Sequence, residues 1–172
     1  MLAQRLVSDL GSVAVWLPMD GFHLAQAELV RAGLADRKGA PETFDRDGFA
    51  ATLQRLASYT SSDSPTIYAP AFDRSIEDSV AAAIAVPASV SLVIVEGNYL
   101  LNWAEIAELL HEVWFLDPGC QARIPALIQR HVEFGKSLEA AREWVMRSDE
   151  PNAEFVDGQR SAADLIITEW PS

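Results

Sequence analysis

Short apolar runs alternate with longer amphipathic stretches along this chain. The apolar runs are rich in β-branched residues and predict strands, and apolar residues that recur every three or four positions predict helices. The predicted strands are residues 13–17, 66–68, 90–95, 112–116 and 163–168. The predicted helices are residues 2–10, 24–32, 103–110, 118–134 and 138–147. A further helix is capped by Asp45 or Asp47 and ends near residue 58, and a last helix begins at Pro151. This alternation predicts an α/β fold whose parallel sheet has helices on both faces.

Composition narrows the class of protein. The chain has 172 residues, 49% of them hydrophobic and 22% charged, which fits one domain with a substantial core. Its formal net charge of −12 argues against a nucleic-acid partner, since contacts to phosphates need clustered Lys and Arg. The apolar runs are too short to span a bilayer, and the first ten residues show no secretory signal. The single cysteine, Cys120, excludes an internal disulfide and favours the cytoplasm.

Two carboxylates follow predicted strands. Asp20 comes shortly after residues 13–17, and Glu96 directly follows residues 90–95. Ligands of open α/β sheets bind beyond the carboxyl ends of the strands. Phosphoryl transfer needs one acid for a nucleophilic hydroxyl and one near magnesium, for which a single Glu suffices. The alternatives are an ordinary Asp-Gly turn at Asp20 and a chance position of Glu96 at the edge of the sheet.

Two polar segments contain further candidate binding residues. Residues 37–45 combine both charge signs with a glycine and a proline, as binding loops often do; the alternative is a solvated connection in which Asp45 caps a helix. Residues 68–74 place aromatic residues, Asp73 and Arg74 just past a strand. The planar guanidinium of Arg74 suits a phosphate or a hydroxyl-rich ligand, and a surface turn formed with Asp73 is the alternative.

Basic residues gather in the predicted helices of the C-terminal third. They are Arg123, Arg130, Lys136, Arg142 and Arg147. Such a group would suit a lid that closes over nucleotide phosphates, and amphipathic helices with solvated basic faces are the alternative. His111, His131 and Cys120 lack the spacing of metal ligands.

Five segments, in order and at matching spacing, resemble the phosphoribulokinase/uridine kinase family of P-loop kinases. They are residues 18–24, 37–45, 68–74, 95–101 and 152–153, and the likeness runs from the first residue to residue 165. The nearest branch holds nucleoside or nucleotide kinases and fructokinase-like and pantothenate-kinase-like members. The resemblance implies a three-layer α/β/α fold of the P-loop NTPase type, with residues 1–172 as one kinase-like domain and a lid near residues 123–150.

The resemblance also implies roles for individual residues. Asp20 would be the general base and Glu96 would occupy the Walker-B-like position, both reaching Mg²⁺ through water. The acceptor pocket would be formed by Phe22, His23, Arg37, Lys38, Glu42, Phe44, Asp45, Tyr68, Phe72, Arg74 and Tyr99. Arg130 would meet ATP in the lid, together with Arg123 and Arg147. ATP and Mg²⁺ would be the cofactors, and a small nucleoside, sugar or pantothenate-like alcohol would accept the γ-phosphoryl group.

One feature of the family is missing from the sequence, because no G-x-x-x-x-G-K-[ST] segment occurs in it. In the family, a strand and this phosphate-binding loop precede a helix like residues 2–10, so we expect a chain that is truncated at its N-terminus and is inactive without the loop. The alternatives are a non-catalytic ligand-binding protein with a kinase fold and a gene fragment. Metal-dependent hydrolysis is less favoured because the acids lack supporting histidines. We also expect a homodimer, in which self-association covers apolar surface.

Overall fold

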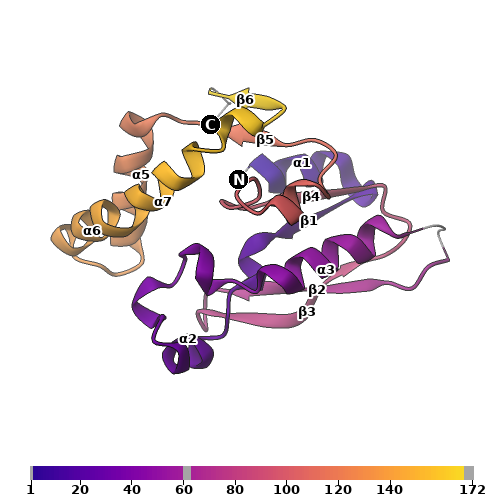
Figure 1. Cartoon of the computed structure of the whole chain (residues 1–172), viewed down its shortest axis with the longest axis horizontal. Coiled ribbons are helices and arrows are strands. Elements are labelled where there is room, and N and C mark those ends of the chain that lie inside the picture. The colour runs from indigo at the N-terminus through magenta and orange to yellow at the C-terminus, as the bar shows by residue number, and fades with distance from the viewer. Residues whose placement is uncertain (1, 60–62, 169–172) are drawn as a thin grey trace. The chain divides into compact units, whose positions relative to one another are not determined.

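The computed structural model describes residues 2–59 and 63–168, and the chain divides into two compact units (Figure 1). The first unit comprises residues 1–109 and contains both predicted strand-end carboxylates. The second comprises residues 110–172 and contains the predicted lid. Each unit has a pair of parallel strands as well as helices, so the predicted α/β class is confirmed.

The first unit is organised around the parallel strands β1 (Ala14–Pro18) and β4 (Leu92–Glu96). Helix α1 (Leu2–Leu10) contacts both strands and buries Ala3. The register pairs Ala14 with Leu92 and Pro18 with Glu96, so the two strands end side by side. Strand β4 is less buried than its apolar sequence predicts: Leu92 is 45% exposed and the next three residues are half-buried. Within the described residues, β4 pairs with β1 alone.

Three helices of the first unit lie between or after these strands. They are α2 (Gln26–Ala32), α3 (Arg46–Ala57) and the short α4 (Ala104–Ala107). The predicted cap of α3 is confirmed at Asp45, whose side chain accepts a hydrogen bond from the Gly48 N–H at 2.9 Å. Phe49 and Leu53 form the buried face of α3. Helix α2 ends at Gly33, whose φ of 70° favours glycine.

The first unit also contains an antiparallel hairpin, β2 (Ile67–Asp73) and β3 (Asp78–Val86). The sequence predicts only residues 66–68 as a strand here, and no strand at residues 78–86. Strand β3 is rich in alanine, which has weak β propensity, and it lacks an alternating apolar pattern. The register shifts between Ala69 and Ala71, around Pro70, which has no N–H to donate to a partner strand. The sequence patterns therefore miss this antiparallel hairpin, which accompanies the predicted parallel strands.

The second unit pairs β5 (Trp114–Leu116) with β6 (Leu165–Ile167) in parallel. Between them lie α5 (Cys120–Glu133), α6 (Leu138–Trp144), a π-helical turn (Val145–Asp149) and α7 (Glu150–Asp157). Pro151 lies in the first turn of α7. Proline lacks an N–H and its ring crowds the carbonyl four residues before it, which disfavours regular α-helix here, and a π turn directly precedes α7. None of the described helices is long and apolar enough to cross a membrane.

Candidate active site

The two predicted carboxylates lie at the same end of the β1–β4 pair. Asp20 is in the 3-10 turn Met19–Phe22 that directly follows β1, and Glu96 is the last residue of β4. Glu96 is in register with Pro18, and neighbouring strands lie about 4.8 Å apart. The local backbone is tightly packed, because a Cβ at Gly21 would lie 2.3 Å from the Pro70 carbonyl oxygen. The site therefore needs glycine beside Asp20.

The charge on Asp20 affects Glu96. Burial raises the pKa of Glu96, the negative charge of Asp20 raises it further, and Arg74 acts in the opposite direction. A carboxyl group whose pKa is raised by burial and by a neighbouring negative charge has free energy to gain from a bound cation. Such a perturbed acid is more typical of functional sites than of ordinary surface pairs.

Arg74 reaches this end of the sheet from the turn after β2. Its Nη2 lies 3.4 Å from Oδ2 of Asp20, and the two side chains are 58% and 42% exposed. A charge-assisted bond of full strength would be shorter, at about 2.7–2.9 Å. Arg74 therefore neutralises part of the Asp20 charge, and its contact with the carboxylate is weaker than a full charge-assisted hydrogen bond.

His23 connects Asp20 to the aromatic residues. Its Nδ1 lies 2.8 Å from the Asp20 backbone oxygen, and its ring centroid lies 4.0 Å from that of Phe44 and 5.0 Å from that of Phe72. Burial lowers the pKa of His23, which favours the neutral ring. Because a carbonyl can only accept, Nδ1 is the donor in this bond, and Nε2 of the neutral ring is an acceptor available to a hydroxyl.

Lys38 and Arg74 both lie over the ring of Phe72. The Lys38 Nζ is 5.2 Å and the Arg74 Cζ is 5.7 Å from the ring centroid. Lys38 also donates to the backbone carbonyl of Glu77 and to Oε1 of Gln26. We name the group formed by Asp20, His23, Lys38, Phe72, Arg74 and Glu96 the strand-end site.

The loop at residues 37–45 is held by buried hydrogen bonds. The Tyr99 hydroxyl donates to the Gly39 carbonyl at 2.6 Å. The Thr43 hydroxyl donates to the Ala40 carbonyl at 2.7 Å and accepts from the Gly39 N–H at 3.0 Å. Tyr99 and Thr43 are fully buried, so they fix the shape of the loop from behind. Tyr99 is a predicted acceptor-binding residue that the structure places in this supporting position.

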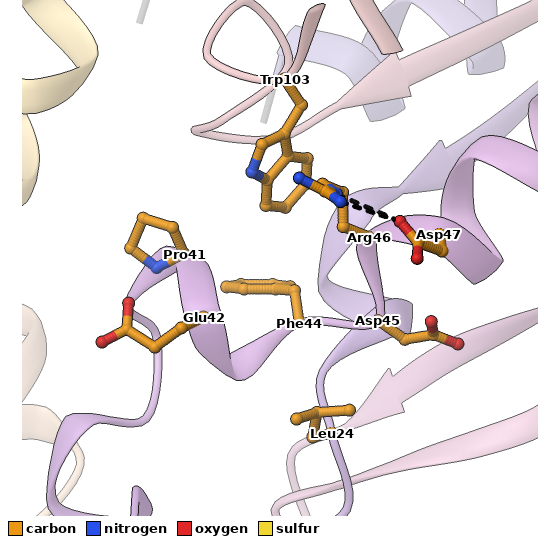
Figure 2. Close-up of a pocket in the computed structure, with 8 residues that line it drawn as sticks. All are labelled: Leu24, Pro41, Glu42, Phe44, Asp45, Arg46, Asp47 and Trp103. Atoms are coloured by element: carbon orange, nitrogen blue, oxygen red, sulfur yellow. Dashed lines mark hydrogen bonds and ion pairs between the residues drawn. The ribbon is translucent and has the colours of Figure 1, made fainter. Parts of the chain in front are cut away.

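A groove of about 470 Å³ lies beside this loop (Figure 2). Its lining residues are Leu24, Pro41, Glu42, Phe44, Asp45, Arg46, Asp47 and Trp103, and we name it the aromatic groove. The ring centroids of Phe44 and Trp103 lie 6.0 Å apart. Its charged groups pair locally: Glu42 with Arg37 at 2.6 Å, and Arg46 with Glu105 at 2.7 Å and with Asp47.

The aromatic groove contains three of the predicted acceptor-binding residues, Glu42, Phe44 and Asp45. The sequence did not point to Trp103 or Arg46 as site residues. A usable signal for Trp103 is its spacing of four from Tyr99, whose ring centroid lies 5.6 Å from that of Trp103. Arg46 gives no such signal, because it looks like any exposed residue in the first turn of a helix.

Known proteins resemble this chain over most of its length. ATP-dependent kinase-like protein notR' of Aspergillus versicolor is 34% identical over 165 residues, which cover 88% of this chain and 95% of that protein. A candidate uridine kinase of Schizosaccharomyces pombe, C227.14, is 30% identical over 161 residues, covering 88% of this chain and 67% of its own. The crystal structure of a candidate fructose transport system kinase from Silicibacter sp. TM1040 has a TM-score of 0.82 and 34% identity, covering 99% of this chain and 82% of that one. No family model matches the chain.

The chain belongs to the uridine kinase family of P-loop kinases. This membership confirms the family resemblance that was predicted from the five sequence segments, and it confirms the P-loop kinase fold class. It also makes the chain a relative of ATP-dependent kinase-like proteins. The matched region spans from 57% to 95% of the length of the curated relatives.

In this uridine kinase family member, two predicted acceptor-binding residues lie apart from both the strand-end site and the aromatic groove. Phe22 is buried, with its ring centroid 4.6 Å from that of Phe49, so it is a core residue behind Asp20. Tyr68 is 58% exposed on β2. Arg37 lies at the rim of the groove through its ion pair with Glu42.

The predicted lid arginines all lie in the second unit. Arg123 makes a two-pronged ion pair with Glu150, Arg130 is exposed on α5, and the Arg147 guanidinium lies 5.4 Å from the Trp144 ring centroid. His131 contacts Asp149 at 2.8 Å. Arg123 therefore has a structural partner already, whereas Arg130 presents its charge to solvent.

The fit of Mg²⁺ depends on Asp20 and Glu96. The described residues contain no group of three or more His, Cys, Asp and Glu side chains that could hold a metal ion. Magnesium in phosphoryl-transfer sites needs only one or two carboxylates, with waters and substrate phosphates as the other ligands. Glu96, whose ionised form is disfavoured by burial and by the charge of Asp20, fits that requirement together with Asp20.

Proposed function

We propose that this protein is an ATP-dependent small-molecule kinase, which transfers the γ-phosphoryl group of MgATP to a hydroxyl of its substrate. The observation that carries the proposal is the pair of carboxylates at the shared end of β1 and β4, with the pKa of Glu96 raised partly by Asp20. Membership of a kinase family supports the reaction type. Positioning and electrostatics supply most of the catalysis in such reactions, so few residues are needed.

Asp20 is the proposed general base. Its carboxylate is 42% exposed, so a substrate hydroxyl has access to it, and Arg74 at 3.4 Å holds it in place. Accepting the hydroxyl proton in the transition state contributes about 10²–10⁴-fold to the rate. The neutral His23 offers Nε2 as an acceptor for a second hydroxyl of the substrate.

Glu96 is the proposed residue near the cofactor. Glu96 and Asp20 would hold Mg²⁺ through water, and the ion would neutralise developing charge on the phosphates. The lid arginines Arg123, Arg130 and Arg147 are proposed to contact ATP, with Arg130 the strongest candidate because its side chain is exposed.

The acceptor is proposed to bind across the strand-end site and the loop at residues 37–45. Relatives are described as a candidate uridine kinase and a candidate fructose transport system kinase, which supports a nucleoside or a sugar hydroxyl as the acceptor. A pantothenate-like alcohol fits the same chemistry. Phe44 and Phe72 supply apolar surface for the carbon skeleton.

The proposal is tested by incubating the protein with MgATP and a panel of nucleosides, sugars and pantothenate, with product detected by ³¹P NMR. We expect one class of acceptor to yield a phosphate monoester and ADP in equal amounts. Glu96→Gln should raise the Mg²⁺ concentration needed for half-maximal rate, whereas the exposed Glu108→Gln serves as control. Binding of acceptors with no transfer from MgATP would instead support the non-catalytic alternative.

A further inference from the structure

The strand-end site contains two cations that come from separate parts of the chain. Lys38 belongs to the loop between α2 and α3, and Arg74 follows β2. Both cationic groups lie within 5.7 Å of the centroid of the Phe72 ring, and the His23 ring lies 5.0 Å from the same centroid. Positive charge is thus concentrated beside the proposed base in a chain whose formal net charge is −12.

Lys38 is held in position by neutral groups. Its ammonium donates to the Glu77 carbonyl and to the Gln26 side-chain oxygen. Among the ion pairs of residues 2–59 and 63–168, none involves Lys38. A cation that is oriented by neutral acceptors keeps its charge available for an incoming anion.

The aromatic groove has fewer cations relative to its carboxylates than the strand-end site, where Lys38 and Arg74 match Asp20 and Glu96 in number. Four carboxylates lie in it or pair with its residues, and only two guanidiniums balance them. The carboxylates are those of Glu42, Asp45, Asp47 and Glu105, and the guanidiniums are those of Arg37 and Arg46. An anionic group is therefore better placed over Phe72, beside Lys38 and Arg74, than in the aromatic groove.

We propose that the acceptor is an anionic hydroxy compound, whose carboxylate or phosphate is bound by Lys38 and Arg74 while its hydroxyl faces Asp20. This rests on the proposed kinase function and narrows its substrate class. In the reaction, the acceptor oxygen forms a bond to the γ-phosphorus and loses its proton to Asp20. The bond from the γ-phosphorus to the bridging oxygen breaks, and ADP leaves with that electron pair. Engagement of Arg74 by the acceptor also loosens its contact with Asp20, which makes the base available.

The test compares matched acceptors that differ only in the anionic group: glycerate with glycerol, pantothenate with panthenol, and ribose 5-phosphate with ribose. Binding is measured by calorimetry without ATP, and transfer from MgATP by product analysis. The variants are Lys38→Met and Arg74→Met, with Lys38→Arg and Arg74→Lys as charge-retaining partners. Arg31→Met is the control, since Arg31 is an exposed residue of α2 that forms an ion pair with Glu28.

We expect the anionic member of at least one pair to bind more tightly. Each Met variant should weaken that binding by about 10–100-fold, the size of a lost charge-assisted hydrogen bond. The charge-retaining variants should recover most of the loss, and the carboxylate and phosphate pairs should show which anion is preferred. Anion binding without any transfer would leave this inference standing and overturn the proposed function. The inference would be overturned, and the kinase function left standing, if the neutral members bound or reacted as well as the anionic ones and the Met variants had no effect. A panel in which no anionic compound binds would also overturn the inference.

Discussion

The strand-end site and the aromatic groove share Phe44 as a neighbour but are built in different ways. The strand-end site brings together residues from the turn after β1, from β2 and the turn after it, from β4 and from a loop, and the charge of Asp20 raises the pKa of Glu96 there. The groove is formed mostly by residues 41–47, and its charged side chains are paired with near neighbours. Charged groups gathered from separate parts of the chain are typical of a catalytic site, whereas aromatic rings beside locally paired charges are typical of a binding surface. We therefore propose that catalysis takes place at the strand-end site and that the aromatic groove recognises the shape of a ligand.

Among the changes that distinguish the two regions, Gly21→Ala, beside Asp20 of the strand-end site, is expected to have the largest effect. Its new Cβ would lie 2.3 Å from the Pro70 carbonyl oxygen, and backbone cannot move aside as a flexible side chain can. We expect a loss of about 3 kcal/mol in the free energy of unfolding, measured by urea denaturation. Gly158→Ala is the control, because its Cβ would come no closer than 3.4 Å to its neighbours. Equal stability of the two variants would show that Asp20 is not held by this close approach.

A smaller effect is expected from Tyr99→Phe, which removes the hydrogen bond to the Gly39 carbonyl. Loss of one such bond costs about 1 kcal/mol of stability. Tyr59→Phe is the control, since the Tyr59 hydroxyl donates to the Val86 carbonyl at 2.7 Å and accepts from the Ile67 N–H at 3.0 Å, away from the loop. Both variants should lose stability, but only Tyr99→Phe should raise the KM for the acceptor. An equal rise of KM in both variants would show that the Tyr99 hydroxyl does not position the loop at residues 37–45.

The smallest effect is a pH dependence of stability that comes from Glu96. Its pKa is raised in the folded protein above the ordinary value of 4.5, so the folded state holds the proton more tightly than the unfolded state. The stabilisation is fully present below pH 4.5 and is lost as the pH rises through the folded pKa. Relative to Glu96→Gln, the wild-type protein should therefore become progressively less stable over that range in thermal melts. A stability difference that stays constant with pH would contradict the electrostatic account of the site.

Much of the strand-end site can be predicted from the sequence, because its key residues follow strands that local patterns reveal. The apolar runs that end near Asp20 and Glu96 predict β1 and β4, and parallel strands bring their carboxyl ends together. The cap of α3 at Asp45 is similarly local. Arg74 was a candidate because it follows a strand, although its approach to Asp20 depends on where the hairpin packs.

The hairpin and the groove are harder to predict, because they depend on tertiary contacts. Strand β3 forms although its alanines have weak β propensity, since pairing with β2 outweighs local preference. Trp103 lies in the groove although it is about sixty residues after Phe44 in the sequence, and local periodicity does not predict a contact over that separation. Burial of Tyr99 behind the loop also follows from packing alone.

The most direct test of the catalytic assignment is the single-turnover rate of phosphoryl transfer by Asp20→Asn, with the exposed Asp9→Asn as control. Asparagine keeps the size of the side chain and its contact with Arg74 but cannot accept the hydroxyl proton. The account predicts a rate about 10²–10⁴-fold below wild type with the affinity for MgATP unchanged. A rate for Asp20→Asn equal to that of Asp9→Asn would remove Asp20 as the base and contradict the account.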